Sequence, residues 1–240
     1  MGQGVERCHV VSAYPKSGNT WLARMLAHAI CCEVVAYISD AKERVPRESS
    51  LHAEELRHDV VIARSHHMAS LLMLGGFASN DIVSVVRDPR DIAVSGSGFF
   101  FSANNVPNEN LIDQMIDQMV RTEKPCVRWQ DVRWDTFVRS SIEKNVILVR
   151  YVDLLQDTKG VLKRILTRLG YDRSDEQIDE VVSYHSFASS KSRAAASGQN
   201  DVFQYLRSGE AGAYRTHLLP RQQQRIESEF GQTMRELGYL

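Results

Sequence analysis

Four short runs of the chain are almost wholly apolar, and each lies next to a charged or turn-forming residue. They are CHVVSAY (Cys8 to Tyr14), DVVIARS (Asp59 to Ser65), DIVSVVR (Asp81 to Arg87) and NVILVRY (Asn145 to Tyr151). Runs that are apolar throughout, without alternation, are typical of strands in a parallel sheet that is covered on both faces. We therefore predict four strands of such a sheet.

Between these runs, apolar residues recur every three or four positions, which predicts amphipathic helices. The first helix carries Trp21, Leu22, Met25, Leu26, Ala29 and Ile30. The others cover 108–122, about 129–141, 158–171 with a C-cap at Gly170, and about 220–237, and one more begins at Asp88-Pro89. Strands that alternate with helices predict an α/β fold, here one domain over residues 1–240 with a central, mainly parallel sheet flanked by helices.

Two polar stretches do not fit this alternation. Residues 39–55 are ambiguous, and ASSKSRAAASGQND (188–201) is small and polar, so we expect a lid or loop there. The chain shows neither an internal repeat nor a domain boundary.

Charge and cysteine content narrow the classes of function. Lys plus Arg is 29 and Asp plus Glu is 30, and the net charge of −1 argues against nucleic-acid binding through bulk charge. The four cysteines, Cys8, Cys31, Cys32 and Cys126, have no metal-binding spacing, so we expect free thiols and no metal. No signal peptide, myristoylation pattern or membrane-length apolar run is present, which indicates a cytoplasmic protein without a membrane partner.

The loop after the first predicted strand could hold an anion. In SAYPKSGNTWLARML, Lys16 offers a cation, Ser17 and Thr20 offer hydroxyls, Gly18 permits close backbone approach, and a helix follows. The loop lacks the residue order of the nucleoside-triphosphatase phosphate loop, because Lys16 precedes Gly18. The alternative is a solvated turn with a helix cap.

A second candidate lies in VVRDPRDIAVS. Arg87 ends a strand, where open α/β sheets bind ligands, and its guanidinium suits a phosphate. Ser95 follows two helical turns later. The alternative is a salt bridge from Arg87 to Asp88 or Asp91.

Taken together, these stretches resemble the PAPS-dependent sulfotransferase family, whose donor is 3′-phosphoadenosine 5′-phosphosulfate (PAPS). YPKSGNTW and RDPRDIAVS are followed, in the family's order, by VRYVDLL, LRSGEAGAYRTHL and FGQTMRELGY, and the last is similar to bacterial members. The resemblance covers nearly the whole chain. It implies sulfuryl transfer from PAPS to a hydroxyl, or to an amine, of a small molecule.

The resemblance also implies a role for each matched residue. Lys16, Ser17, Gly18, Asn19 and Thr20 would hold the 5′-phosphosulfate. The 3′-phosphate would be bound by Arg87, Ser95, Arg207, Ser208 and Gly209, and the adenine by Trp21, Tyr151 and Phe187.

Several positions depart from the family pattern. Asn19 stands where Thr is common, Val152 where Glu is, Ser208 where Lys is, and Tyr214 where Trp is. The dimerisation motif of animal cytosolic members is absent after Arg215, so the oligomeric state stays open.

The reaction needs a base for the acceptor hydroxyl and a cation for the leaving phosphate oxygen. Lys16 is our candidate for the cation. His66 is the candidate base, because Arg64-Ser65-His66 resembles the K-T-H of many members. Neighbouring residues of a strand point to opposite faces, so His67 should lie outside the site. The alternative is that both histidines are structural.

The acceptor is the least determined part of the site. Residues 38–50, 99–107 and 188–201 are expected to shape its pocket, and Phe99, Phe100 and Phe101 favour an apolar acceptor unless they belong to the core. Two other functions remain open, a nucleotide or metabolite kinase and a PAPS-binding protein without catalysis.

Overall fold

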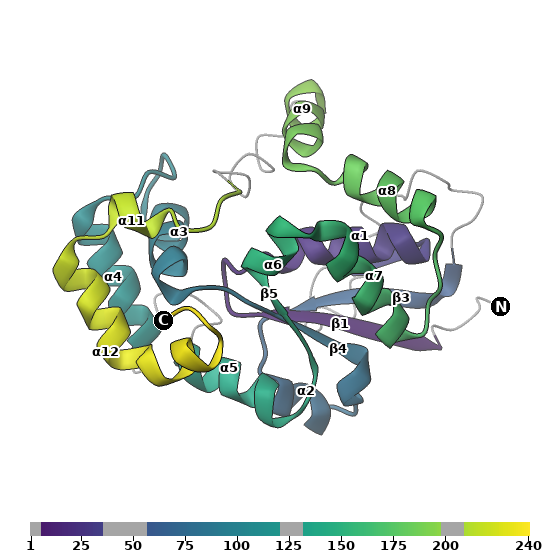
Figure 1. The fold of residues 1–240 in the computed structure, drawn as a ribbon, viewed down its shortest axis with the longest axis horizontal. Coiled ribbons are helices and arrows are strands. Elements are labelled where there is room, and N and C mark those ends of the chain that lie inside the picture. The colour runs from purple at the N-terminus through teal and green to yellow at the C-terminus, as the bar shows by residue number, and fades with distance from the viewer. Residues whose placement is uncertain (1–5, 36–56, 121–131, 198–208) are drawn as a thin grey trace.

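The chain folds around a five-stranded sheet that is parallel throughout. The computed structural model describes residues 6–35, 57–120, 132–197 and 209–240. The strands lie in the order β2-β3-β1-β4-β5, and every adjacent pair is parallel. The predicted α/β class and all four predicted strands are confirmed (Figure 1).

The strand bounds are β1 Arg7–Ala13, β2 Cys32–Val35, β3 Arg57–Ser65, β4 Ile82–Val86 and β5 Ile147–Arg150. The helices before β5 are α1 Asn19–Ile30, α2 Ala69–Leu74, α3 Pro89–Phe101, α4 Glu109–Val120 and α5 Trp134–Glu143, with a 3₁₀ turn at Ser79–Asp81. The helices after it are α6 Tyr151–Gln156, α7 Thr158–Leu169, α8 Asp175–Tyr184, α9 Phe187–Ser197, α11 Tyr214–His217 and α12 Pro220–Glu236.

Helices cover both faces of the sheet and gather beyond one end of it. Figure 1 shows α1, α6, α7 and α8 on one face, α2 and α5 on the other, and α3, α4, α11 and α12 beyond the carboxyl ends of the strands. One apolar core joins the sheet to α1 and α7, and a second joins α3, α4, α5 and α12. Of the donor-site candidates, Ser95 lies on α3, whereas Trp21 and Tyr151 pack with the first core.

The register of the sheet aligns the strand ends that carry these candidates. Ser12 of β1 pairs with Ser65 of β3, and Ala13 pairs with Val85 of β4. Val86 in turn pairs with Arg150 of β5. The residues that follow these four strands therefore emerge along one edge of the sheet.

One helix begins and another ends at a capping residue that the sequence predicts. The Asp88 carboxylate accepts a hydrogen bond from the Arg90 backbone N–H and so caps α3, with Pro89 in the first turn. Gly170 closes α7 in the left-handed conformation, at φ 86°. The helix predicted from about residue 129 begins at Trp134, and residues 129–131 lie outside the described part.

Three predictions need correction. The sequence interpretation missed β2, a four-residue edge strand whose pattern Glu33 interrupts. The loop expected from Ala188 is helical as far as Ser197, because α9 covers that part; residues 198–201 lie outside the described part. Tyr151 is the first residue of α6 rather than the last of a strand.

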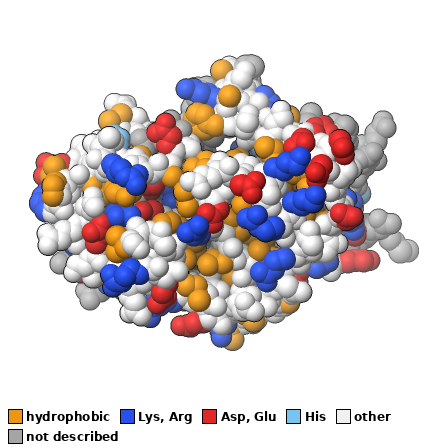
Figure 2. Space-filling view, viewed as in Figure 1, with side chains coloured by type: hydrophobic (Ala, Val, Ile, Leu, Met, Phe, Trp, Pro, Cys, Tyr) orange, Lys and Arg blue, Asp and Glu red, His pale blue; other side chains and the backbone are white. Residues whose placement is uncertain are grey.

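The surface mixes charges of both signs. Figure 2 shows Lys and Arg side chains next to Asp and Glu side chains. Between α7 and α8, Lys159 pairs with Asp179 and Lys163 pairs with Asp175. Cys8, Cys31 and Cys32 are free thiols, whereas Cys126 lies outside the described residues. Within the described ranges, none of the helices has the length and apolar character needed to cross a membrane.

Candidate functional site

The loop between β1 and α1 is built on two residues with positive φ. Lys16 has φ 69° and Gly18 has φ 98°, and the Ser17 N–H donates to the Tyr14 carbonyl, with N and O 3.2 Å apart. A Cβ on Gly18 would lie 2.9 Å from two ring carbons of Tyr151, so only glycine fits at this contact. The loop therefore turns tightly against the Tyr151 ring before α1 begins.

Arg87 joins this loop to a distant segment of the chain. Its Nη1 donates to the Lys16 carbonyl and its Nη2 to the Glu210 carbonyl, each at 3.0 Å. Its guanidinium carbon lies 4.5 Å from the centroid of the Tyr151 ring. The anion-site residues predicted from separate motifs are thus in contact.

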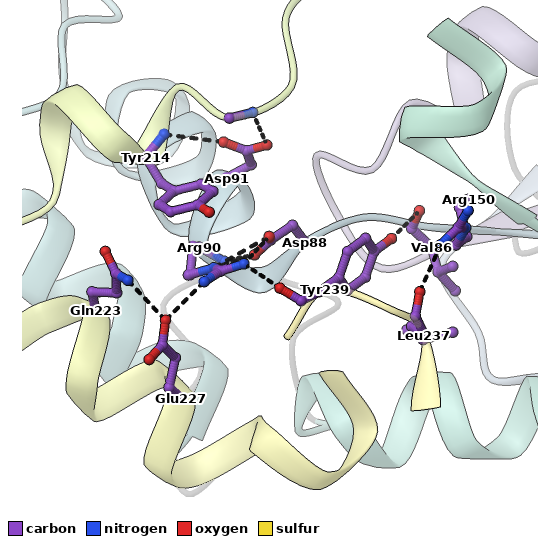
Figure 3. A network of polar contacts seen from close by, with 11 residues as sticks. Val86, Asp88, Arg90, Asp91, Arg150, Tyr214, Gln223, Glu227, Leu237 and Tyr239 are labelled. Carbon is purple, nitrogen blue, oxygen red and sulfur yellow. Dashed lines mark hydrogen bonds and ion pairs between the residues drawn. The ribbon is translucent and has the colours of Figure 1, made fainter. Parts of the chain in front are cut away.

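The alternative of a salt bridge at Arg87 is not what the structure has. Asp88 pairs with Arg90 at 2.7 Å, and Asp91 accepts the backbone N–H groups of Gly212 and Tyr214 (Figure 3). Arg87 itself is buried and is held by two carbonyl oxygens and a ring, none of which neutralises its charge.

Two buried polar atoms give a test of whether an anion fits here. Within the described part of the chain, Ser17 Oγ and Arg87 Nε have no hydrogen-bond partner, although both are buried. Buried donors are normally satisfied, and phosphate oxygens would accept from both atoms. The residues present therefore fit a ligand with anionic groups at two places.

Trp21 and Tyr151 form the aromatic part of the site. Their rings meet edge to face with centroids 6.2 Å apart, and Trp21 Nε1 donates to the His185 carbonyl at 2.8 Å. Burial raises the pKa of Tyr151, so its phenol is neutral near pH 7. Trp21 is half-buried and offers ring surface beside the anion site, whereas the Tyr151 ring is buried beneath Arg87 and the Gly18 loop.

Phe187 and Gly209 also meet, although they come from different elements. A Cβ on Gly209, which has φ 65°, would lie 2.6 Å from the Phe187 ring. Ser95 lies half-buried on α3. Arg207 and Ser208 lie outside the described residues, so their predicted roles stay predictions.

His66 is oriented as a base would be. Its Nδ1 lies 2.7 Å from the Ala13 carbonyl oxygen, which can only accept, so Nδ1 carries the hydrogen and Nε2 carries the lone pair. Burial lowers the pKa of His66 to about 4, and the neighbouring cations Arg64 and Lys16 act in the same direction. The imidazole is therefore neutral at pH 7 and can take a proton.

His67 differs from His66 in its exposure. Its side chain is exposed, and its carbonyl accepts a hydrogen bond from Ser12 Oγ at 2.6 Å. The expectation that only His66 faces the site stays a prediction.

The side chain of Lys16 lies against an aromatic ring. Its Nζ is 3.7 Å from the centroid of Phe99, a distance typical of a cation–π contact. Phe100 and Phe101 pack against the core of α3, α4, α5 and α12. Of the three phenylalanines, only Phe99 is therefore tied to the site by a described contact.

The remaining loop residues are linked to β3. Asn19 Nδ2 lies 3.5 Å from the Ser65 carbonyl, and Thr20 Oγ1 accepts from Arg64 Nη1 at 3.0 Å. The sequence interpretation used Arg64 only to align His66. Its charge beside the loop was a signal that could have singled it out.

Two further residues were given no positive role from the sequence. Glu210 contributes only its backbone carbonyl, which no side-chain pattern reveals. Asp91 was considered only as a partner for Arg87, although its place in the first turn of α3 keeps it close in the chain to Arg87.

The comparisons with known proteins agree on one family. A family model described as "Sulfotransferase domain" matches residues 7–238. Sulfotransferase 1E1 of Cavia porcellus is 21% identical over 253 residues, which cover 94% of this chain and 82% of the relative. The 3-beta-hydroxysteroid sulfotransferase of Cavia porcellus is 24% identical over 239 residues, with 94% and 83% covered.

Solved structures share the fold. Mouse sulfotransferase SULT7A1 complexed with PAP superposes with a TM-score of 0.70 at 21% identity, covering 96% of this chain and 84% of that one. Retinol dehydratase in complex with androsterone and the inactive cofactor PAP gives a TM-score of 0.67 at 18% identity, with 98% and 82% covered. The two sulfotransferases of Cavia porcellus are mammalian and give no support to the bacterial affiliation that the chain's last residues suggested.

Proposed function

The chain belongs to the sulfotransferase domain family, and we propose that it moves the sulfuryl group of PAPS onto a hydroxyl of a small apolar molecule, within one domain spanning residues 1–240. The observation that carries this proposal is the contact between the two candidate anion sites at one sheet edge. The loop around Ser17 and the guanidinium of Arg87 are joined through the Lys16 carbonyl. A nucleotide with phosphate groups at both its 5′ and 3′ positions would occupy both sites.

The donor residues divide by the part of PAPS that each would bind. We assign the 5′-phosphosulfate to Lys16, Ser17, Gly18, Asn19 and Thr20. We assign the 3′-phosphate to Arg87, Ser95, Arg207, Ser208 and Gly209, and the adenine to Trp21, Tyr151 and Phe187. The contacts among Arg87, Tyr151 and the Gly18 loop support this division.

The chemistry is an in-line displacement at sulfur. The acceptor oxygen forms a bond to sulfur while the bond from sulfur to the 5′-phosphate oxygen breaks, which leaves 3′-phosphoadenosine 5′-phosphate (PAP). His66 would take the acceptor's proton on Nε2, and its Nδ1–H···O contact with Ala13 would keep the ring in that tautomer. The Lys16 ammonium would stabilise the charge on the leaving oxygen.

An apolar acceptor with a hydroxyl is favoured by one aromatic contact and by the names of relatives. Phe99 lies beside Lys16 and would present a ring where the acceptor meets the donor. One relative is named for 3-beta-hydroxysteroids, and retinol dehydratase has been solved with retinol and with androsterone. Residues 38–50, which we also expect in this pocket, lie outside the described part.

The test is a labelled transfer assay with a small panel of acceptors. Purified protein is incubated with PAPS and, separately, a steroid alcohol, retinol, a simple phenol and an alkyl amine, and products are read by mass. We expect sulfation of hydroxyl acceptors without added metal. A parallel assay with ATP and Mg²⁺ tests for phosphoryl transfer, and phosphorylation there without sulfation in the PAPS arm would overturn the proposal.

We further propose that the enzyme acts in the cytoplasm on small molecules, with neither nucleic acid nor membrane as a partner. The mixed charge of the face in Figure 2 supports this. Cell fractionation with a tagged chain tests the location, and recovery in the membrane pellet would contradict it.

A further inference from the structure

The segment 209–214 is fastened to α3 by one buried carboxylate. The two oxygens of Asp91 accept the backbone N–H groups of Gly212 at 2.7 Å and of Tyr214 at 3.1 Å (Figure 3). Asp91 is 2% exposed, so these two bonds are formed away from water. Hydrogen bonds to a buried charged acceptor are stronger than bonds between neutral groups.

The same segment touches Arg87, which lies between β4 and α3, four residues before Asp91. The Glu210 carbonyl accepts from Arg87 Nη2 at 3.0 Å, and Gly209 packs against the ring of Phe187. Arg87 thus receives one of its two carbonyl contacts from a segment that Asp91 holds in place. The Asp91 bonds at Gly212 and Tyr214 lie just beyond the contact at Glu210.

The Tyr214 end of this fastening is itself rigid. The guanidinium carbon of Arg90 lies 4.1 Å from the centroid of the Tyr214 ring, and that of Arg215 lies 4.8 Å from it. Arg90 is fixed in turn by Asp88 and Glu227, each at 2.7 Å (Figure 3). Because Tyr214 is held in this way, the segment 209–214 moves away from Arg87 only if its hydrogen bonds to Asp91 break.

We propose that Asp91 is a positioning residue for the donor's 3′-phosphate, because it holds the segment 209–214 against Arg87. This inference rests on the proposed function, in which Arg87 and Gly209 bind that phosphate. Asp91 does not touch the donor in this account. It acts through the backbone of Gly212 and Tyr214.

Because Asp91 is charged, an experiment can distinguish a positioning role from a direct electrostatic effect on the bound phosphate. A carboxylate four residues from Arg87 would repel a phosphate bound there, so neutralising it would strengthen donor binding if charge alone mattered. If Asp91 positions the segment, the same change weakens binding, because an amide accepts at only one of its two polar ends. The two accounts therefore predict opposite signs.

The experiment compares Asp91→Asn with the wild type by calorimetric titration with PAP and with AMP, which lacks the 3′-phosphate. We expect PAP to bind about 10- to 100-fold more weakly, the usual effect of losing a charged hydrogen bond, with AMP binding within about 2-fold. In steady-state assays the KM for PAPS should rise by a similar factor, while kcat changes little. Asp117→Asn, on α4 and paired with Arg225, is the matched control and should leave all these values unchanged.

Hydrogen exchange tests the wild-type protein directly, should the variant fold poorly. We expect slow exchange of the Gly212 and Tyr214 amides, and further slowing across 209–214 with PAP but much less with AMP. Unchanged exchange on adding PAP, or PAP affinity that is kept or raised in a folded Asp91→Asn protein, would overturn the inference. Equal binding of PAP and AMP by the wild type would instead overturn the donor assignment beneath it.

Discussion

The guanidinium carbon of Arg87 lies 4.5 Å above the ring centroid of Tyr151, although the two residues come from motifs far apart in the chain. The sheet explains the contact. Val86 at the end of β4 pairs with Arg150 at the end of β5, so the next residue of each strand emerges beside the other. The same alignment places His66 and the Gly18 loop nearby, because Ser65 and Ala13 end the two adjacent strands.

The first prediction concerns the phosphate preference that Arg87 would confer. Wild-type protein should bind PAP more tightly than AMP, and Arg87→Ala should abolish that preference by weakening PAP about 10- to 100-fold, as expected for lost charge-assisted bonds. Calorimetric titration with both nucleotides measures this. Arg164→Ala, an exposed arginine on α7, is the control. A variant that still prefers PAP would show that the 3′-phosphate binds elsewhere.

The second prediction concerns the contact between Gly18 and Tyr151. Gly18→Ala adds a Cβ 2.9 Å from the ring and also strains a backbone at φ 98°. We expect a loss of about 1–3 kcal/mol in the free energy of unfolding and at least about 10-fold weaker PAP binding. Denaturant titration and calorimetry measure the two effects.

A natural control separates strain from steric overlap. Gly76 has φ 97°, yet a Cβ there would meet nothing within 4 Å. Gly76→Ala should therefore cost only the backbone strain and leave PAP binding unchanged. If both variants lose the same stability and neither loses affinity, the close approach of Tyr151 to the loop has no part in binding.

Much of the fold could be predicted, because buried parallel strands leave an unbroken apolar signal. Val10, Ile62, Val83 and Val149 are buried, and each lies inside an apolar run of the sequence. Strand β2 gave no such signal, since an edge strand is half solvated and tolerates Glu33. The helix α9 was missed because its serines, which have weak helix preference, were given more weight than its alanines, which have the highest.

The site was predictable where side chains carry the chemistry. Lys16, Arg87 and His66 stand at strand ends, and the structure brings them to one edge of the sheet. The contacts made by backbone atoms could not be predicted from the sequence. The carbonyls of Lys16 and Glu210 hold Arg87, and no residue type encodes that role.

The third prediction tests His66 as the base. His66→Ala should lower kcat by about two to four orders of magnitude, the usual contribution of a positioned base, with PAP affinity largely kept. His67→Ala, at the exposed neighbouring position, should have little effect. If His67→Ala is the variant that lowers kcat, the base is His67, and the alignment with the family's histidine is wrong by one residue.

The dependence of kcat/KM on pH in the wild type is a second test of His66 as the base. Because the pKa of His66 is lowered to about 4, the base stays neutral well below the usual range of histidine. We expect kcat/KM to hold level down to roughly pH 5. An acid limb centred near the ordinary histidine pKa would contradict this environment.

The fourth prediction concerns the ring that holds the Lys16 ammonium. Phe99→Leu keeps apolar volume but removes the ring face 3.7 Å from Nζ, so Lys16 loses a fixed position. A cation–π contact contributes about 0.5–2 kcal/mol, which corresponds to a fall in kcat of about 2- to 30-fold. Phe99→Tyr retains the ring face and should stay near wild type in a transfer assay with a simple phenol. Equal activity of the two variants would show that the contact does not serve turnover.

The last prediction links the burial of His66 to acid stability. Below pH 6.5 an unfolded chain protonates this histidine, whereas the folded protein does not until the pH approaches about 4, the lowered pKa. The unfolded state therefore binds more protons in this window, and the free energy of unfolding falls as the pH falls through it, by on the order of 3 kcal/mol for this group. Other groups titrate too, so the informative quantity is the difference between wild type and His66→Gln, which keeps an N–H donor toward Ala13. In denaturant titrations at pH 7, 6, 5 and 4.5, the variant should lose progressively less stability than the wild type, and parallel losses in the two proteins would show that His66 is not held neutral by burial.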